Sequence, residues 1–284
     1  MVKVGTASSI LLRVFFETAD GGYYSPFVRD GFEVLPIPEF IGRFKRKEIA
    51  LRFTYSRIPC RYGRCSLSKY LPVDYVLIGG SSYSVNEVIA HWDPRLDIGV
   101  YSDYWRYAGG RIPKSFRNCR EGCYLFFVAG LAKYPHRFFS KPHGFTEIRR
   151  TFMRVDRGIY VVAYMEASQI IDLTEVARQY GIEVGGELGD EKVWEVVCSE
   201  FDERICETPH RARGIDLPVV ILSDNYGFLK RPIPIMEWRE GRRLLTNYSY
   251  IFGVRSFDDR VRYKVFNNLE TRNIIKLLER EGAL

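Results

Sequence analysis

The sequence predicts an α+β fold with mixed α/β character, formed as one large domain over residues 1–284. Strand-like and helix-like segments alternate irregularly along the chain, with more strands in the N-terminal half, which favours a central mixed sheet with long functional loops. No internal repeat and no low-complexity linker divides the chain, and 284 residues suffice to bury a large core.

Apolar runs bounded by turn residues predict the strands. A segment that contains Pro36 and Pro38 is expected at a sheet edge, because proline cannot donate a hydrogen bond to a neighbouring strand. The other strands are expected over residues 10–18, 51–55, 73–78, 124–131, 158–165 and 217–222.

Helical spacing of apolar residues, together with capping residues, predicts the helices. Asp172 begins one of them and Gly181 ends it. Ser84 is expected to cap a short helix that runs through Ile89 and delivers His91 at or just beyond its C-terminal end. The longer helices are expected over residues 172–180, 191–201 and 268–281.

Composition indicates an ordinary soluble globular protein, with 46% hydrophobic and 27% charged residues. No apolar run approaches the roughly 20 residues that span a bilayer, and the N-terminus lacks the pattern of a secretory signal. We therefore expect a cytoplasmic protein with no membrane partner. The net charge of +7 favours a nucleic acid or nucleotide as partner, whereas no pattern identifies a protein partner. The scarcity of Gln beside abundant Arg and Glu is typical of a thermophilic source.

Six cysteines leave three alternatives open. Two close pairs could form a four-thiolate zinc site, the cysteines could form disulfides, or they could be buried thiols. Their spacing alone does not choose between these states. The cysteines are Cys60 with Cys65, Cys119 with Cys123, and Cys198 and Cys206 far downstream.

The densest group of ionisable residues lies between His91 and Asp103, where one histidine and three carboxylates fall within thirteen residues. Asp93 precedes Pro94 and is disfavoured in a helix, so these carboxylates are expected on a loop. Imidazole and carboxylates together can bind a divalent metal or form an acid–base set. A solvated acidic turn is the structural alternative. We predict that His91, Asp93 and Asp103 are catalytic, with Asp97 in support, and that His91 and Asp93 are the ligands if a divalent metal is the cofactor.

A second group follows the first predicted strand. Glu17 is predicted to reach into the site as a further catalytic residue. The adjacent Gly21 and Gly22 would let backbone N–H groups approach a phosphate or sugar, although a tight turn is the more frequent reason for such a pair. The predicted binding residues are Asp20, Gly21, Gly22, Ser25, Asp97 and Tyr101.

Other motifs argue against several enzyme classes. The chain has no Gly-x-Ser-x-Gly elbow, no Walker loop and no dinucleotide-binding fingerprint. His136, His143 and His210 lie among Arg, Lys or Pro residues. We expect them to be solvated histidines on a basic surface more often than phosphate contacts. The 19 Tyr and 19 Phe could supply platforms for base stacking, although most must form the core.

Four blocks of sequence occur in an order that resembles a known family. The first block contains Phe16-Glu17-Thr18, Gly21-Gly22, Ser25-Pro26, Asp30-Gly31 and Pro36-Ile37-Pro38. The later blocks are His91-Trp92-Asp93-Pro94 with Tyr101-Ser102-Asp103, then Phe126-Phe127-Val128-Ala129-Gly130-Leu131, then Leu222-Ser223 with Tyr226-Gly227-Phe228. In this order they resemble the nucleotide modification associated domain 3 family. Glu17 stands where the family has aspartate, and Ser102 where it has glycine.

The resemblance implies modification of a nucleotide or of a base in nucleic acid, without defining the reaction. We therefore predict a nucleotide-modifying or DNA-modifying enzyme with a His/Asp active site. One alternative is a metal-dependent nuclease or phosphohydrolase that uses the same residues. Another is a non-catalytic module that binds nucleic acid or a modified base. Beyond a divalent metal, no cofactor is indicated.

Overall fold

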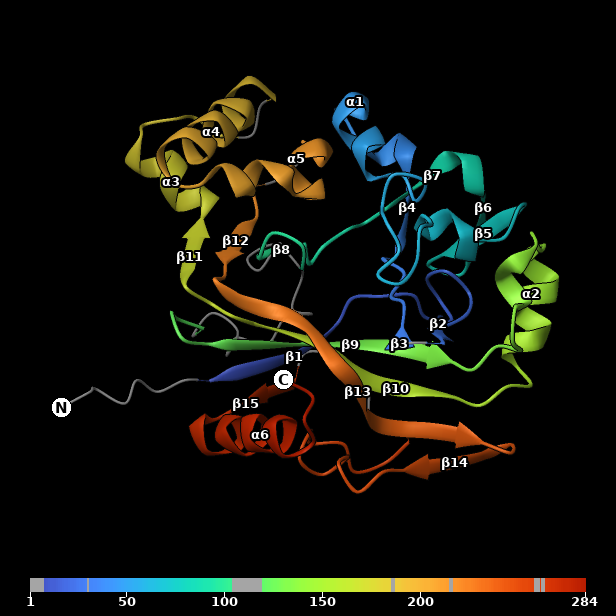
Figure 1. The fold of residues 1–284 in the computed structure, drawn as a ribbon. Helices are drawn as coiled ribbons and strands as arrows, with labels where there is room; N and C mark the ends of the chain where they lie inside the picture. Colours follow the sequence, from blue (N-terminus) through green and yellow to red (C-terminus); the bar gives the residue numbers. More distant parts are fainter. Residues whose placement is uncertain are drawn as a thin grey trace.

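The computed structural model describes residues 8–29, 31–103, 119–184, 187–214, 217–257, 261 and 264–284. It confirms the predicted α+β class: a large mixed sheet crosses the molecule, and helices lie on its two sides and at one end (Figure 1). The order of strands along this sheet is β14-β13-β10-β9-β1-β15, with β2 paired to β9 and β3 paired to β2. Their bounds are β1 Ser9–Arg13, β2 Ser25–Val28, β3 Gly31–Phe32, β9 Tyr124–Ala132, β10 Arg157–Glu166, β13 Asn225–Arg239, β14 Arg242–Leu245 and β15 Lys264–Phe266.

The interior of the large sheet is formed by strands that come from distant parts of the chain. β1 pairs parallel with β9, so that Ser9 lies opposite Tyr124, and antiparallel with β15. β10 lies antiparallel between β9 and β13. β9 is buried along almost all of its length because apolar layers cover both of its faces. Gly130 is required within it, since a Cβ there would lie 2.4 Å from the ring of Tyr24.

Three smaller sheets and several helices complete the fold. The three-stranded sheet β11-β12-β8 is covered by α3 and α4 around the fully buried Trp194. Its bounds are β8 Val100–Asp103, β11 Gln169–Asp172 and β12 Val219–Leu222, and the two-stranded sheets pair β4 Pro38–Phe40 with β7 Val88–Ala90 and β5 Tyr75–Ile78 with β6 Ser81–Ser84. The helices are α1 Lys47–Ala50, α2 Phe145–Phe152, α3 Leu173–Gln179, α4 Glu187–Glu200, α5 Pro209–Arg213 and α6 Asn268–Arg280.

The longer predicted elements are confirmed. The expected strands over 73–78, 124–131, 158–165 and 217–222 correspond to β5, β9, β10 and β12, and the three longer helices to α3, α4 and α6. Asp172 caps α3 by accepting hydrogen bonds from the backbone of Thr174 and Glu175, as its position predicts. α6 begins with a capping box between Asn267 and Glu270.

Three short elements differ from the prediction, one of them entirely and two in part. Residues 51–55 form no strand, because the 3-10 helix Leu51–Phe53 continues from α1 and buries Phe53. The strand expected over 10–18 ends at Arg13, after which only single bridges occur. Ser84 does cap a 3-10 helix, Val85–Glu87, but the chain then enters β7, whose buried β-branched residues pair with β4. Asp30, which belongs to the first sequence block, lies outside the described residues.

The structure resolves the state of the cysteines. They form three disulfides: Cys60–Cys65, Cys119–Cys123 and Cys198–Cys206. The zinc and free-thiol alternatives are thereby excluded in this structure, since all six cysteines are paired. In the described part of the chain, no helix combines the length and apolarity that crossing a bilayer requires.

Candidate functional site

The segment from His91 to Asp103 bridges two of the small sheets. It leaves the end of β7, where the His91 N–H donates to the carbonyl of Ile37 at 2.8 Å, and it ends in β8. Between them, the Asp93–Pro94 peptide is cis, and a turn closed by Arg95 N–H to Val100 O leads into the strand. Asp93 and Asp97 therefore lie on a loop as predicted, whereas Asp103 is the last residue of β8.

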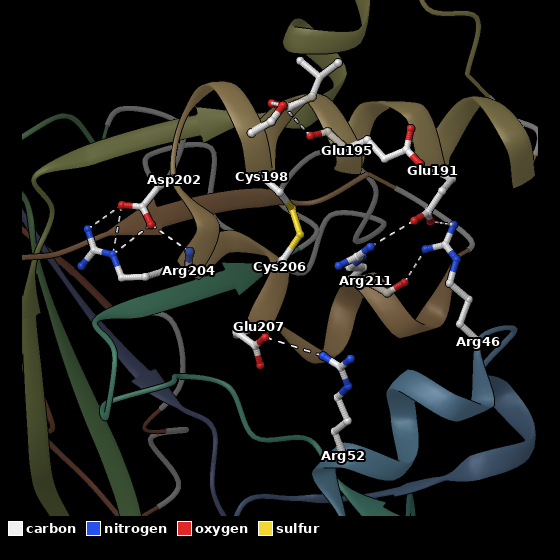
Figure 2. Close-up of a disulfide and its surroundings, with 12 residues drawn as sticks. Arg46, Arg52, Glu191, Glu195, Cys198, Asp202, Arg204, Cys206, Glu207 and Arg211 are labelled. Carbon is white, nitrogen blue, oxygen red and sulfur yellow. Dashed lines mark hydrogen bonds and ion pairs between the residues drawn. A yellow bond between two sulfur atoms is a disulfide. The ribbon is translucent and has the colours of Figure 1, made fainter.

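A second chain segment, α5, carries His210 to the same place. α5 begins at Pro209, whose ring suits a first helical turn, and ends at Gly214 in the left-handed conformation. The disulfide between Cys198 of α4 and Cys206 fixes the 3-10 helix Glu203–Glu207 that precedes α5 (Figure 2).

Ion pairs hold α5 against its neighbours, as Figure 2 also shows. Glu191 of α4 binds both Arg46, at 2.6 Å, and Arg211 of α5, at 3.1 Å. Arg46 in turn donates to the carbonyl oxygen of Arg211 at 2.6 Å. Arg46 is itself buried and directly precedes α1. The cluster therefore connects α4, α5 and the start of α1.

Asp93, Ser102 and His210 form a buried hydrogen-bonded group. Both carboxylate oxygens of Asp93 accept from the Ser102 N–H, at 3.1 and 3.0 Å, and the Ser102 hydroxyl also donates to Asp93. Nδ1 of His210 lies 2.6 Å from the Ser102 oxygen and 3.3 Å from Asp93. Since the hydroxyl proton points to Asp93, Nδ1 is the donor to Ser102, and the Nε2 atom of a neutral His210 carries the lone pair.

His91 is oriented in a comparable way by Glu39 of β4. Its Nδ1 lies 2.9 Å from a carboxylate oxygen of Glu39, and the other oxygen of Glu39 contacts Arg213 of α5. An ionised carboxylate only accepts, so Nδ1 of a neutral His91 is protonated and its Nε2 carries the lone pair. Glu39 is buried, and its charge is compensated by Arg213.

The two imidazoles are neighbours, with ring centroids 4.8 Å apart and planes at 72°. Burial lowers the pKa of both His91 and His210 below the ordinary value for histidine, and the carboxylates of Asp93 and Asp103 oppose this in part. Both rings are therefore neutral at pH 7, and each can accept a proton.

Carboxylates and arginines surround these rings in a cavity of about 260 Å³. Asp103 lies on its wall and accepts a hydrogen bond from the Tyr101 hydroxyl at 2.8 Å. Three arginines from separate segments reach the same cavity: Arg13 of β1, Arg43 at the end of the 3-10 helix Ile41–Arg43, and Arg213 of α5. The cavity thus combines neutral bases with cations that suit an anionic ligand. Its remaining lining residues are Val14, Asp20, Ile37, Pro38, Glu39, Ile78, His91, Asp93, Ser102 and His210.

The residues present also fit a metal. His91, Asp93 and His210 offer one ligand atom each, and these atoms all lie within 4.8 Å of one another. Two imidazoles and one carboxylate are a common ligand set for divalent transition metals. Both imidazoles are hydrogen-bonded through Nδ1 to an acceptor, the arrangement that usually orients a metal-binding histidine.

Comparison with known proteins gives a family. A family model described as "Nucleotide modification associated domain 3" matches residues 8–183, more than half of the chain. The chain belongs to this family. Neither a curated protein nor a solved structure matches it. Within this nucleotide modification associated domain 3 protein, the match includes Glu39, His91, Asp93 and Ser102, whereas His210 lies beyond it.

Five of the residues predicted for the site line the cavity of the nucleotide modification associated domain 3 protein: His91, Asp93, Tyr101, Asp103 and Asp20. The side chain of Asp20 accepts from the Gly79 N–H at 2.8 Å. Glu17 pairs with Arg13 at 3.1 Å, so among the described residues it is Arg13, and not Glu17, that reaches the cavity.

The remaining predicted residues occupy structural positions outside that lining. The N–H groups of Gly21 and Gly22 donate to Leu77 O and Glu17 O, and a Cβ at either glycine would clash with an aromatic ring. Ser25 is buried and accepts from the Leu35 N–H. Asp97 turns away from the cavity and forms a two-bonded ion pair with Arg95.

Sequence reasoning missed six polar residues of the cavity in this nucleotide modification associated domain 3 protein: Arg13, Glu39, Arg43, Ser102, His210 and Arg213. His210 was expected on a solvated basic surface, but it is only 3% exposed. A signal was present in its surroundings, because Thr208-Pro209 predicts a helix start and Gly214 a helix end. Ser102 stands where the family has glycine, but the sequence does not reveal its contact with His210.

Proposed function

We propose that this protein is an enzyme that modifies a nucleotide or a base in nucleic acid, with the cavity around His91 and His210 as its active site. The family supports the nucleotide-related part of this proposal. The observation that supports a catalytic role for this cavity is the pair of neutral imidazoles, each oriented through Nδ1 and placed in one cavity with three arginines. Such pairs of oriented bases and cations are typical of active sites and rare in cores.

The residues suggest a division of roles. A neutral imidazole can take a proton from a hydroxyl or amine, and the carboxylate behind it stabilises the imidazolium that forms. Glu39 has this role for His91. Asp93 has it for His210, both through the Ser102 hydroxyl and through its own carboxylate oxygen, which lies 3.3 Å from Nδ1 of His210. The arginines Arg13, Arg43 and Arg213 would bind the phosphate of a nucleotide. Asp103 is the remaining carboxylate close enough to influence both rings.

The test is to express the wild-type protein and the His91→Ala and His210→Ala variants in a bacterial host and to digest the host DNA and RNA to nucleosides. Mass spectrometry is expected to reveal a nucleoside of new mass with the wild type. Each histidine variant should reduce its amount at least about 100-fold, because loss of a general base typically costs that much. Arg272→Ala, at an exposed residue of α6 outside the cavity, is the control that should retain it. A nucleoside unchanged by all three variants would place the chemistry elsewhere.

A metal-dependent reaction, such as hydrolysis of a phosphate ester, is the second candidate. It is favoured by one specific observation, the approach of His91, Asp93 and His210 to within 4.8 Å. A divalent ion held by these residues would supply an activated water or polarise a phosphoryl oxygen. Cleavage of unmodified DNA that depends on a divalent ion would distinguish this candidate from a base-modifying enzyme.

Thermal unfolding tests whether a metal binds here. Zn²⁺ or Mn²⁺ in large excess over Kd is expected to raise Tm of the wild type by about 5 °C, because a ligand bound only to the native state stabilises it. The rise should disappear in His91→Ala and His210→Ala and remain in His136→Ala. An equal rise in all four proteins would place the metal outside the cavity, and no rise in the wild type would contradict the metal candidate.

A further inference from the structure

A larger pocket lies apart from the cavity described above. It has a volume of about 540 Å³ and shares no lining residue with the cavity of His91 and His210. It is formed where β2 meets the end of β9, next to the loop that leads to α2 (Figure 1). Its lining comes from three segments: residues 26–29, residues 62–63 with 69–70, and residues 133–140.

The charged groups that line this pocket are all basic. Arg29, Lys69, Lys133 and Arg137 are exposed on its rim, together with His136, and no Asp or Glu belongs to the lining. Within the described chain, none of these four cations takes part in an ion pair, although Lys69 lies 5.5 Å from the ring centroid of Tyr70. Such a rim attracts phosphates, although Glu33 lies close enough to Lys69 to interact with its charge.

The body of the pocket is aromatic. Its rings are half-buried, apart from the buried Tyr70, and so present apolar surface between the cations: Phe27, Tyr62, Tyr70, Tyr134, Phe138 and Phe139. Phe138 stacks with Tyr134, at a centroid distance of 5.6 Å, and with His143, at 4.1 Å. The Tyr134 hydroxyl is fixed by a hydrogen bond to the Tyr24 carbonyl. The rings are therefore pre-ordered, which reduces the entropy lost when a ligand stacks on them.

The loop from Pro135 to Ser140 holds this arrangement in a defined shape. Arg137 has φ of 61°, which is uncommon for a residue other than glycine. The turn is closed by hydrogen bonds from the Phe138 N–H to Pro135 O and from the Ser140 hydroxyl to Arg137 O. The carbonyl oxygen of Phe138 accepts from Nε2 of His143 and the carboxylate of Glu147 accepts from Nδ1, which anchors the loop to α2. The loop is braced rather than loosely attached.

We propose that this pocket binds single-stranded nucleic acid, with bases against the aromatic rings and phosphates against the four rim cations. Aromatic side chains interleaved with basic ones are the usual means of binding a single strand. Bases in a duplex are already stacked on each other and offer only their edges, so the rings favour unpaired bases. The inference adds to the proposed function that the substrate of the active site is a polymer. In this respect it rests on the proposed function. The binding itself does not depend on catalysis.

Fluorescence anisotropy with a labelled oligothymidine of about 12 nucleotides tests the proposal. The wild type is expected to bind this strand at least about tenfold more tightly than an abasic strand of equal length, which keeps the phosphates but offers no bases to stack. It should also bind the strand more tightly than a duplex of the same length. The double variant Lys133→Glu/Arg137→Glu is expected to weaken binding at least about tenfold and to reduce the dependence on salt, because two phosphate contacts are lost.

The matched control is Arg272→Glu/Lys276→Glu, which makes the same change of charge at exposed positions of α6. Binding within about twofold of the wild type is expected for it, since the phosphate contacts remain. Equal weakening by both double variants, or equal affinity for the abasic strand or the duplex, would overturn the proposal, as would no binding of oligothymidine by the wild type. His210→Ala should bind as the wild type does. Failure of this proposal is thus separate from failure of the catalytic one, which the analysis of nucleosides detects.

Discussion

Replacing Asp93 with Ala is expected to lower the free energy of unfolding by about 3–5 kcal/mol, the largest loss at a single polar residue of the cavity. Asp93 is only 2% exposed and accepts from both the N–H and the hydroxyl of Ser102, with Nδ1 of His210 at 3.3 Å. Its removal leaves these buried donors without their carboxylate acceptor. Chemical denaturation followed by circular dichroism measures the loss.

Asp97→Ala is the matched control for this variant. Asp97 lies four residues further along the same segment and is also a carboxylate, but its side chain is 40% exposed and, among the described residues, pairs with Arg95 alone. Its removal should cost no more than about 1 kcal/mol, because Asp97 is partly exposed and the buried Arg95 keeps the carbonyl and carboxylate oxygens of Glu207 as partners. A cost at Asp93 that does not exceed the cost at Asp97 would show that Asp93 does not hold the Ser102–His210 group together.

Gly99→Ala is expected to destabilise the protein by about 2–4 kcal/mol. Gly99 has φ of +72°, and a Cβ there would lie 2.3 Å from the backbone oxygen of Ser223 and 2.4 Å from the ring of Tyr226. The carbonyl oxygen of Gly99 also accepts from the Ser223 N–H at 2.9 Å, so the two segments cannot separate without losing that bond. The strain falls directly before β8, which carries Ser102 and Asp103.

Thermal and chemical denaturation of Gly227→Ala provide the comparison. Gly227 follows Tyr226 and lies in β13, but a Cβ there meets no atom within 4 Å, and its φ is not in the left-handed region. A change within about 1 kcal/mol is expected at this position, since only the helix and strand propensities of glycine and alanine differ. Equal effects of the two variants would mean that the turn at Gly99 can relax, and that the close approach to Ser223 does not constrain it.

The fold could be predicted best where a pattern is long. β9 is an apolar run bounded by turn residues, and α6 combines a capping box with an apolar stripe over 13 residues, so local and tertiary preferences agree. The prediction failed at residues 51–55 because alternation over five residues is also produced by a 3-10 helix that buries Phe53. It failed again at Val88 and Ile89, where pairing with β4 decided the conformation.

The candidate site could be predicted only where its residues are close in sequence. The density of ionisable residues between His91 and Asp103 was sufficient to predict this segment as part of a site. His210, by contrast, is 108 positions from its partner Ser102, and Glu39 is 52 positions from His91. Only the arrangement of β4, β8 and α5 brings these residues together. The adjacent glycines Gly21 and Gly22 show the reverse case, in which a motif that suits phosphate binding is explained by packing against rings.

The position of β1 has a consequence for how the chain folds during synthesis. β1 precedes the other described strands, yet both of its partners, β9 and β15, are made more than a hundred residues later. Ribosomal synthesis is slow compared with local folding, so this apolar strand leaves the ribosome long before it can pair. Contacts so distant in sequence also raise the entropic barrier to folding. Among the described strands, β1 is therefore one of the last to be enclosed, and it is the segment that a chaperone would be expected to protect.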